Sequence, residues 1–253
     1  MNILIFLVLH WYISLFAQTF FHHRYGAHKM FQMNKFWEKF FYIFVYITQG
    51  SSFLSPRAYG ILHRMHHAYS DTEKDPHSPH YYNNVFTMMW HTRLIYNDLV
   101  DRKLSAEDRF TKDLPEWRFI DALGESGWSR IGWGFVYIGV YVTYADQWWM
   151  FLFLPVHFLM AAVHGAVVNW LGHTVGYANF DNNDRSKNTF VIDFLMLGEL
   201  FQNNHHKNYQ SANFGSRWYE IDPAYPVLKL FSWLRIIRFE HSGSTRRGSA
   251  HSA

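Results

Sequence analysis

The apolar residues of this 253-residue chain gather in three long stretches and one short stretch. The long stretches cover residues 1–21, 128–145 and 148–170, and the short one covers residues 40–48. A helix of about 20 apolar residues spans the roughly 30 Å hydrocarbon core of a bilayer. The long stretches are therefore predicted to be transmembrane helices, and the last two form a tight hairpin. A buried core helix has the same composition as the first stretch, but the two later stretches favour a membrane span.

The short stretch is too short to cross a membrane by itself. Polar segments rich in histidine lie at residues 22–28, 63–67 and 203–206. If these segments meet at one site, the chain between them crosses the membrane an even number of times. Residues 36–54 are therefore predicted to form a helix that lies on the interface or dips into it. The hairpin crosses twice, so three spans place the N-terminus outside and the histidines inside.

Basic residues support this orientation, because Lys and Arg collect on the cytoplasmic side of membranes. Of the 23 Lys and Arg residues, 22 fall on the histidine side, and Arg130 lies at the edge of a span. Residues 225–240 alternate apolar turns with basic residues, which predicts an amphipathic surface helix. The polar residues 241–253 predict a disordered tail.

The predicted fold class is an all-α integral membrane protein. Residues 1–253 form one domain with about three transmembrane helices, interfacial helices and a cytoplasmic helical cap that carries the histidines. In a bacterium this would place the chain in the inner (cytoplasmic) membrane.

Composition narrows the chemistry. The chain has no cysteine, which excludes disulfides, thiolate nucleophiles and cysteine-held zinc or iron–sulfur sites. Any metal must be bound through nitrogen and oxygen atoms. The net charge of +3 is small and no nucleic-acid-binding motif occurs, so no nucleic acid partner is predicted.

Histidine spacing is the strongest chemical signal in the chain. Two triads have the same spacing and each shares one helix face: His63, His66 and His67, and then Gln202, His205 and His206. Asn169 and His173 are four residues apart at the end of the last predicted span. His23 and His28 are five apart, about 140° around an α-helix, so we expect them to bracket a helix end. Two helices that each present a triad suit two metal ions bound between them.

The other histidines are expected to play lesser parts. Those expected at the surface or beside metal ligands are His22, His77, His80 and His91, and those expected to pack inside the spans are His10, His157 and His164. Imidazole suits zinc, copper, nickel and iron. A catalytic zinc needs about three protein ligands, fewer than this set supplies. Haem needs one axial histidine on each of two facing helices, whereas the clusters lie outside the spans. A dinuclear non-haem iron centre uses all of the ligands.

The sequence resembles a known family at these residues. HRYGAH, HRMHHAYSDTEKDPHSPH, NWLGH and NNHH resemble the histidine boxes of membrane fatty-acyl desaturases of the stearoyl-CoA type, from about His22 to Trp233. The resemblance implies that five histidines hold the first iron: His23, His28, His63, His67 and His205. It implies that the second iron is held by His66, His173 and His206, with Asn169 acting through water. His66, His173, His205 and His206 are also expected to be catalytic.

Gln202 departs from the family, because a histidine ligand of the second iron usually stands there. Its amide can offer a carbonyl oxygen to iron, hold a water, or only brace a neighbouring histidine. Asp71 and Asp75 are expected to orient ligands. One helix precedes the first histidines where the family usually has a complete hairpin. Only 47 residues follow His206, too few for a fused cytochrome b5 domain, so a separate electron donor such as ferredoxin or cytochrome b5 is expected.

The resemblance implies an enzyme that uses O2 and two electrons to place a cis double bond in a long fatty-acyl chain. The substrate would be an acyl-CoA, an acyl-carrier protein conjugate or a phospholipid, bound from the surrounding membrane lipid. The middle carbons of an acyl chain have no polar handle, so an oxidant made from O2 at iron is needed. Two alternatives stay open: a hydroxylase on the same iron scaffold, and a non-catalytic membrane carrier of metal or haem.

Overall fold

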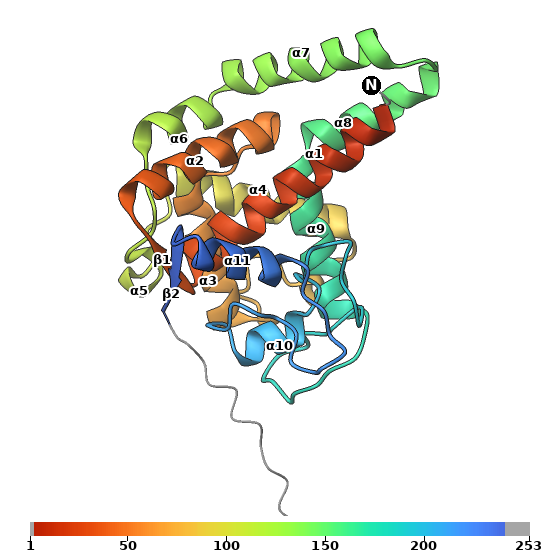
Figure 1. The fold of residues 1–253 in the computed structure, drawn as a ribbon. Helices are drawn as coiled ribbons and strands as arrows, with labels where there is room; N and C mark the ends of the chain where they lie inside the picture. The colour runs from red at the N-terminus through yellow and green to blue at the C-terminus, as the bar shows by residue number, and fades with distance from the viewer. Residues whose placement is uncertain (1–2, 241–253) are drawn as a thin grey trace, which may run out of the picture.

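The computed structural model describes residues 3–240, and these are mostly helical. The elements that form the body are α1 (Ile3–Ala17), η1 (Gln18–Ala27), α2 (Lys35–Gln49), η2 (Gly50–Ser52), α3 (Pro56–Tyr69), η3 (Pro79–Tyr81), α4 (Val85–Val100), α5 (Asp108–Thr111), α6 (Arg118–Glu125), α7 (Gly127–Tyr144), η4 (Trp148–Phe153), α8 (Leu154–Phe158), α9 (Met160–Thr174), α10 (Gln202–Lys207) and α11 (Ala224–Trp233). Figure 1 shows α7 across one end of the molecule and α10 near the opposite end.

One helix in the described part is long and apolar enough to cross a membrane, formed by α1 and η1 together over Ile3–Ala27. It covers the first predicted span. The third predicted span is helical but broken, because Trp148–Phe158 and Met160–Thr174 meet at an angle of 74°. The second predicted span is the single helix α7, whose Arg130 and glycines lower its hydropathy. The number of membrane crossings therefore stays a prediction.

The C-terminal prediction is wrong in part. The helix α11 ends at Trp233, and Arg235 has a left-handed backbone with φ of 59°. The chain then forms strand β2 (Ile237–Phe239), which pairs antiparallel with β1 (Phe31–Met33). Pairing with a distant strand overrode the local amphipathic pattern. The predicted tail at 241–253 lies outside the described residues.

The predicted helix at residues 36–54 is α2 followed by the short turn η2. Asn34 caps α2 by accepting a hydrogen bond from the Trp37 amide, and Gly50 ends it. The buried face of α2 packs on η1 in an aromatic core that also includes Phe20, Phe31 and Phe201. This core fixes η1, the segment that carries the first histidines.

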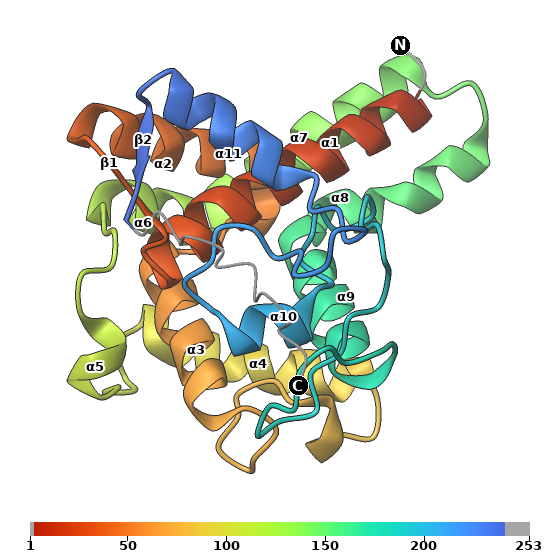
Figure 2. The same cartoon turned by 60° about the horizontal axis from the view of Figure 1, so that its bottom comes forward.

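The two views agree on where the histidine segments meet. In Figures 1 and 2, α3, α9 and α10 gather on the side of the molecule away from α7. The segment η1 contacts α3, and α10 contacts α9. The four histidine-bearing segments are therefore neighbours although they are far apart in sequence.

Candidate metal centre

The segment η1 is a π-helix, and its geometry places two histidines together. A π-helix bonds each amide to the carbonyl five residues earlier, as the His28 amide bonds to the His23 carbonyl at 3.1 Å. Residues five apart then lie on one face, and the ring centroids of His23 and His28 are 5.0 Å apart. The expected separation of about 140° assumed an α-helix. His28 still caps the helix end, as predicted.

The helix α3 divides its triad between two groups, because residues three and four apart diverge slightly around the helix. His63 and His67 face the η1 histidines, while His66 faces His173 of α9 and His206 of α10. The short helix α10 divides its pair in the same way, since His205 joins the first group and His206 joins the second. The α9 residue His173 completes the second group.

Five Nε2 or Nδ1 atoms of the first group lie within 4.8 Å of one another, from His23, His28, His63, His67 and His205. The Nε2 atoms of His28 and His63 are 2.7 Å apart, and His67 Nε2 lies 3.0 Å from both His63 Nε2 and His205 Nε2. Adjacent ligand atoms around an octahedral ion with bonds of about 2.1 Å are about 3.0 Å apart. This spacing fits one metal ion.

The second group has three buried nitrogens that converge without a protein partner. The Nε2 atoms of His66, His173 and His206 have no hydrogen-bond partner in the described structure. The Nδ1 atom of each ring bonds to a carboxylate: His66 to Asp75 at 2.9 Å, His173 to Asp71 at 3.0 Å and His206 to Asp184 at 2.6 Å. A carboxylate fixes the proton on Nδ1, so the Nε2 lone pair faces the centre of the group.

The electrostatics favour neutral rings at His28, His63, His67 and His205, and ionised carboxylates around the second group. Burial, followed by the charges of neighbouring histidines, lowers the pKa of His63 and His205 well below its usual range. Burial opposes ionisation of Asp184, but hydrogen bonding and attraction to His206 outweigh it and lower its pKa. Neutral imidazole is the form that binds a metal.

Asn169 and Gln202 carry amides rather than imidazoles, and other contacts describe their surroundings. Gln202 Nε2 donates a hydrogen bond to the Glu199 carbonyl at 2.7 Å, so the amide nitrogen already has a protein partner. The side chain packs directly over Gly172, where a Cβ would collide with it. Both amides line a cavity whose wall also includes His63 and His77. The direct-ligand, water-holding and bracing roles of Gln202 therefore all stay open.

Asp71 and Asp75 lie where sequence analysis expected orienting groups, but two further carboxylates were missed. Asp184 comes from a loop with no helical spacing to signal it. Glu199 lies 2.6 Å from His23 Nδ1 and also pairs with the buried Arg24 at 3.1 Å. Each lies far along the chain from one of its partners, so only the fold brings them together.

His77 was expected at the surface or beside ligands, and the structure buries it. Its ring lies against His66, with centroids 4.3 Å apart and ring planes tilted by 36°. Neither ring nitrogen has a partner in the described structure. Its amide donates to Asp75 at 3.0 Å, so the same carboxylate orients His66 and His77. His22 is also buried and binds the Leu54 carbonyl through Nε2 at 2.8 Å.

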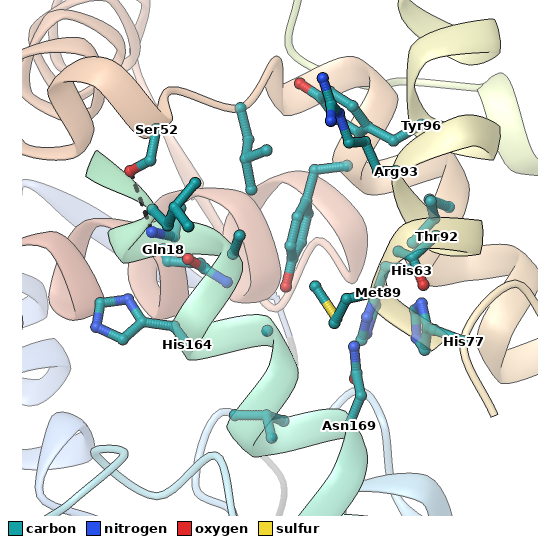
Figure 3. A pocket seen from close by; sticks show the side chains of 18 of the residues that line it. Gln18, Ser52, His63, His77, Met89, Thr92, Arg93, Tyr96, His164 and Asn169 are labelled. Carbon is teal, nitrogen blue, oxygen red and sulfur yellow. Dashed lines mark hydrogen bonds between the residues drawn. The ribbon is translucent and has the colours of Figure 1, made fainter. Parts of the chain in front are cut away.

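A cavity of about 890 Å³ begins beside the histidines. Figure 3 shows His63, His77 and Asn169 close together at one part of its wall, with Arg93 and Tyr96 farther along. Apolar groups from α1, α7 and the α8–α9 region line much of the remainder, including Leu15, Ile131, Phe158 and Ala162. The volume lies within the range of about 300–1,000 Å³ that is usual for ligand sites. The cavity can hold a long apolar molecule against the histidines.

Two imidazole groups beside a mostly apolar cavity define a candidate metalloprotein that acts on an apolar chain. The fatty acid desaturase family model matches residues 1–232, so the chain belongs to the fatty acid desaturase family. It is an oxidoreductase that acts on fatty acyl chains, in a family that is generally metal-dependent and membrane-associated.

Relatives of the chain include lipid and CoA desaturases. It is 30% identical over 246 residues to an sn-1 stearoyl-lipid 9-desaturase of Anabaena variabilis, covering 90% of this chain and 79% of the relative. It is 30% identical to an sn-1 stearoyl-lipid 9-desaturase of Synechocystis sp., covering 85% of this chain and 64% of the relative. It is also 30% identical to an acyl-CoA 5-desaturase of Anemone leveillei, covering 90% and 68%.

Proposed function

We propose that this chain is an O2-dependent desaturase that places a cis double bond in a long fatty-acyl chain at a histidine-ligated di-iron centre. One observation carries the proposal: eight histidines form two groups of converging nitrogens beside a mostly apolar cavity. The first iron would be held by His23, His28, His63, His67 and His205. The second would be held by His66, His173 and His206, with Asn169 and Gln202 contributing directly or through water.

The donor set fits two irons better than the alternatives. Eight imidazoles exceed the needs of a catalytic zinc. The nitrogens of the first group lie within 4.8 Å of one another, which leaves no room for a porphyrin between them. Four carboxylates lie one contact away from ligand rings: Asp71, Asp75, Asp184 and Glu199. Their negative charges balance cations that neutral imidazoles alone would leave uncompensated.

Iron would supply the activation of O2 that an unactivated C–H bond requires. The task of this chain is to position the acyl carbons and exclude water. The apolar cavity would hold the chain by burial. The catalytic part that the family resemblance implies would fall to His66, His173, His205 and His206. The four carboxylates keep the ligand rings in one tautomer and one orientation.

The likeness to lipid and CoA desaturases supports a substrate carried as acyl-lipid or acyl-CoA. An acyl-carrier protein conjugate is the third carrier to assay as a substrate. Electrons would come from a separate protein such as ferredoxin or cytochrome b5. The apolar helix Ile3–Ala27 supports an integral membrane protein. The excess of Lys and Arg on the histidine side supports a cytoplasmic position for the histidines.

The test is a metal and product analysis of the purified protein. We expect two irons per chain and, with O2 and a reductase system, a cis-unsaturated acyl product. A hydroxylated product would indicate the hydroxylase alternative. An active sample with one metal ion would refute the dinuclear site, and a haem absorbance spectrum would support the carrier alternative.

A further inference from the structure

The broken helix α8–α9 shapes the cavity beside the metal centre, and this shape bears on a property of the reaction that the metal ligands do not determine. The break falls at Leu159, between α8 and α9, and bends the helix pair by 74°. A break in an apolar helix leaves backbone groups without helical partners, which is costly away from water. Such a break persists only where other groups satisfy the backbone.

The turn η2 satisfies two backbone groups at this break. Ser52 Oγ accepts a hydrogen bond from the Ala161 amide at 3.1 Å, and Ser51 Oγ donates to the Phe158 carbonyl at 3.1 Å. Ser52 Oγ donates its own proton to the Gln49 carbonyl at 2.8 Å, which leaves its lone pairs for the Ala161 amide. Figure 3 marks the bond from Ser52. We call Gly50–Ser52 the serine tip.

The helix α7 also contacts the serine tip, in addition to α2 and the α8–α9 break. Gly50 has φ of +52°, and a Cβ there would collide with the hydroxyl of Tyr137. Arg130 donates to the Ser51 carbonyl at 3.2 Å and to the Phe53 carbonyl at 3.2 Å. The tip is therefore a fixed wedge between α7 and the break.

The same groups form the wall of the cavity. The cavity is lined by Ser51, Ser52, Phe158, Leu159 and Ala161. Asn169, farther along α9, lies near His63 and His77 at what we call the metal end of the cavity (Figure 3). An acyl chain that follows this wall takes its direction from the bend. The position of the bend relative to the metal end then decides which carbon lies beside the histidines.

We infer that Ser51 and Ser52 determine the position of the new double bond, by holding the α8–α9 break that shapes the acyl path. They are positioning residues and touch neither metal group. The inference rests on the proposed function, because it concerns the site of desaturation. It assigns positional specificity to hydroxyl groups on α2–η2 rather than to the metal ligands.

The experiment compares Ser51→Ala/Ser52→Ala with the wild-type protein, measuring bond position by mass spectrometry and iron per chain. Loss of one hydrogen bond shifts an equilibrium by about fivefold, and the double variant loses the bonds to both Phe158 and Ala161. We therefore expect the fraction of off-position isomers to rise by about five- to 30-fold. Iron content should not change. Ser52→Thr, which keeps a hydroxyl, should stay closer to wild type. Ser14→Ala is the matched control, because Ser14 is a buried serine in α1 whose hydroxyl has no partner in the described structure.

A second measurement does not depend on turnover. Stearoyl probes with a diazirine at successive carbons are crosslinked to the iron-loaded protein, and the carbon that labels the metal end is identified. We expect the serine double variant to shift that carbon by one position or more. Unchanged crosslinking and isomer distribution in a folded, iron-loaded double variant would overturn the inference. A wild-type protein that shows the crosslinking pattern but no unsaturated product would overturn the proposed function instead.

Discussion

Asp184 offers a direct test of how the second metal group is built. Its Oδ2 lies 2.6 Å from His206 Nδ1, and it also accepts bonds from the amide and hydroxyl of Ser186. Asp184→Asn keeps the size of the side chain and removes its charge. The amide can still accept one hydrogen bond, so His206 keeps a partner but loses the charge that fixes its proton on Nδ1.

The size of the effect follows from that contact. A hydrogen bond to a charged group contributes about 1.5–3 kcal/mol, roughly twice the value for a neutral pair. Removing a carboxylate that orients a metal-bound histidine costs about 10- to 100-fold in metal affinity. We therefore expect Asp184→Asn to weaken binding of the second metal within that range and to leave the first nearly unchanged, because Asp184 contacts no ring of the first group.

The assay is a chelator competition that follows the loss of each metal from the loaded protein. Asp181→Asn is the matched control, since Asp181 lies in the same loop, carries the same charge and is exposed. Wild type and Asp181→Asn should lose their metals together, while Asp184→Asn should release one metal at a lower chelator concentration. Equal retention of both metals in Asp184→Asn would show that the carboxylate contributes nothing to the site.

Three further predictions test other parts of the structure. If the Gln202 amide serves the second iron, Gln202→Ala should lower activity strongly with the fold intact, and Gln202→His should keep metal. His206→Ala should lower activity more than Gln202→Ala does, because imidazole is the stronger ligand. The measurement is an activity assay with iron quantification on all three variants, and full turnover in Gln202→Ala would show that Gln202 is not part of the site. Ile47→Cys should resist labelling from outside intact cells while Asp146→Cys is labelled, and external labelling of Ile47→Cys would contradict the three-span topology. Arg24→Met should destabilise the protein by about 3–5 kcal/mol, because it leaves the buried carboxylates of Glu199 and Asp222 without the guanidinium that compensates their charge. An unchanged thermal midpoint in detergent would contradict this.

The labelling position follows from the structure rather than from the sequence pattern. Gly50 is the obvious residue to label at the end of α2, but a Cβ there would collide with the Tyr137 hydroxyl. A cysteine at Gly50 would disturb the fold whose topology it is meant to report. Ile47 lies one turn earlier on α2 and is 52% exposed, so it accepts a label without repacking.

Sequence spacing predicted the histidine triads because it depends only on helix geometry. His63, His66 and His67 occupy one face of α3, and the division between the two groups follows from the same spacing. The carboxylates were less accessible to this reasoning. Asp71 and Asp75 follow the triad closely in sequence, whereas Asp184 and Glu199 reach their histidines through loop conformations that no periodicity encodes.

The strand pair β1–β2 and the serine tip could not be predicted for a related reason. Each depends on a partner more than 100 residues away, such as Phe239 for Phe31 or Phe158 for Ser51. The local sequence of residues 225–240 favoured a continuous helix. The energy of pairing with β1 is a tertiary effect, and it outweighs that local preference.

Two departures from ideal α-helices build the site. In η1 the π-helical turn brings His23 and His28 onto one face, which an α-helix with the same sequence would separate by about 140°. At Leu159 the break between α8 and α9 bends the wall of the cavity that also reaches His63 and His77. Side chains bind backbone groups at both places: Arg64 donates to the Ala27 carbonyl at the end of η1, and Ser52 accepts from the Ala161 amide at the break. Both irregular segments contribute residues to the wall of a single cavity, which indicates that the functional residues of this fold lie on irregular backbone. The regular helices α1, α3 and α4 pack against these segments and fix their positions.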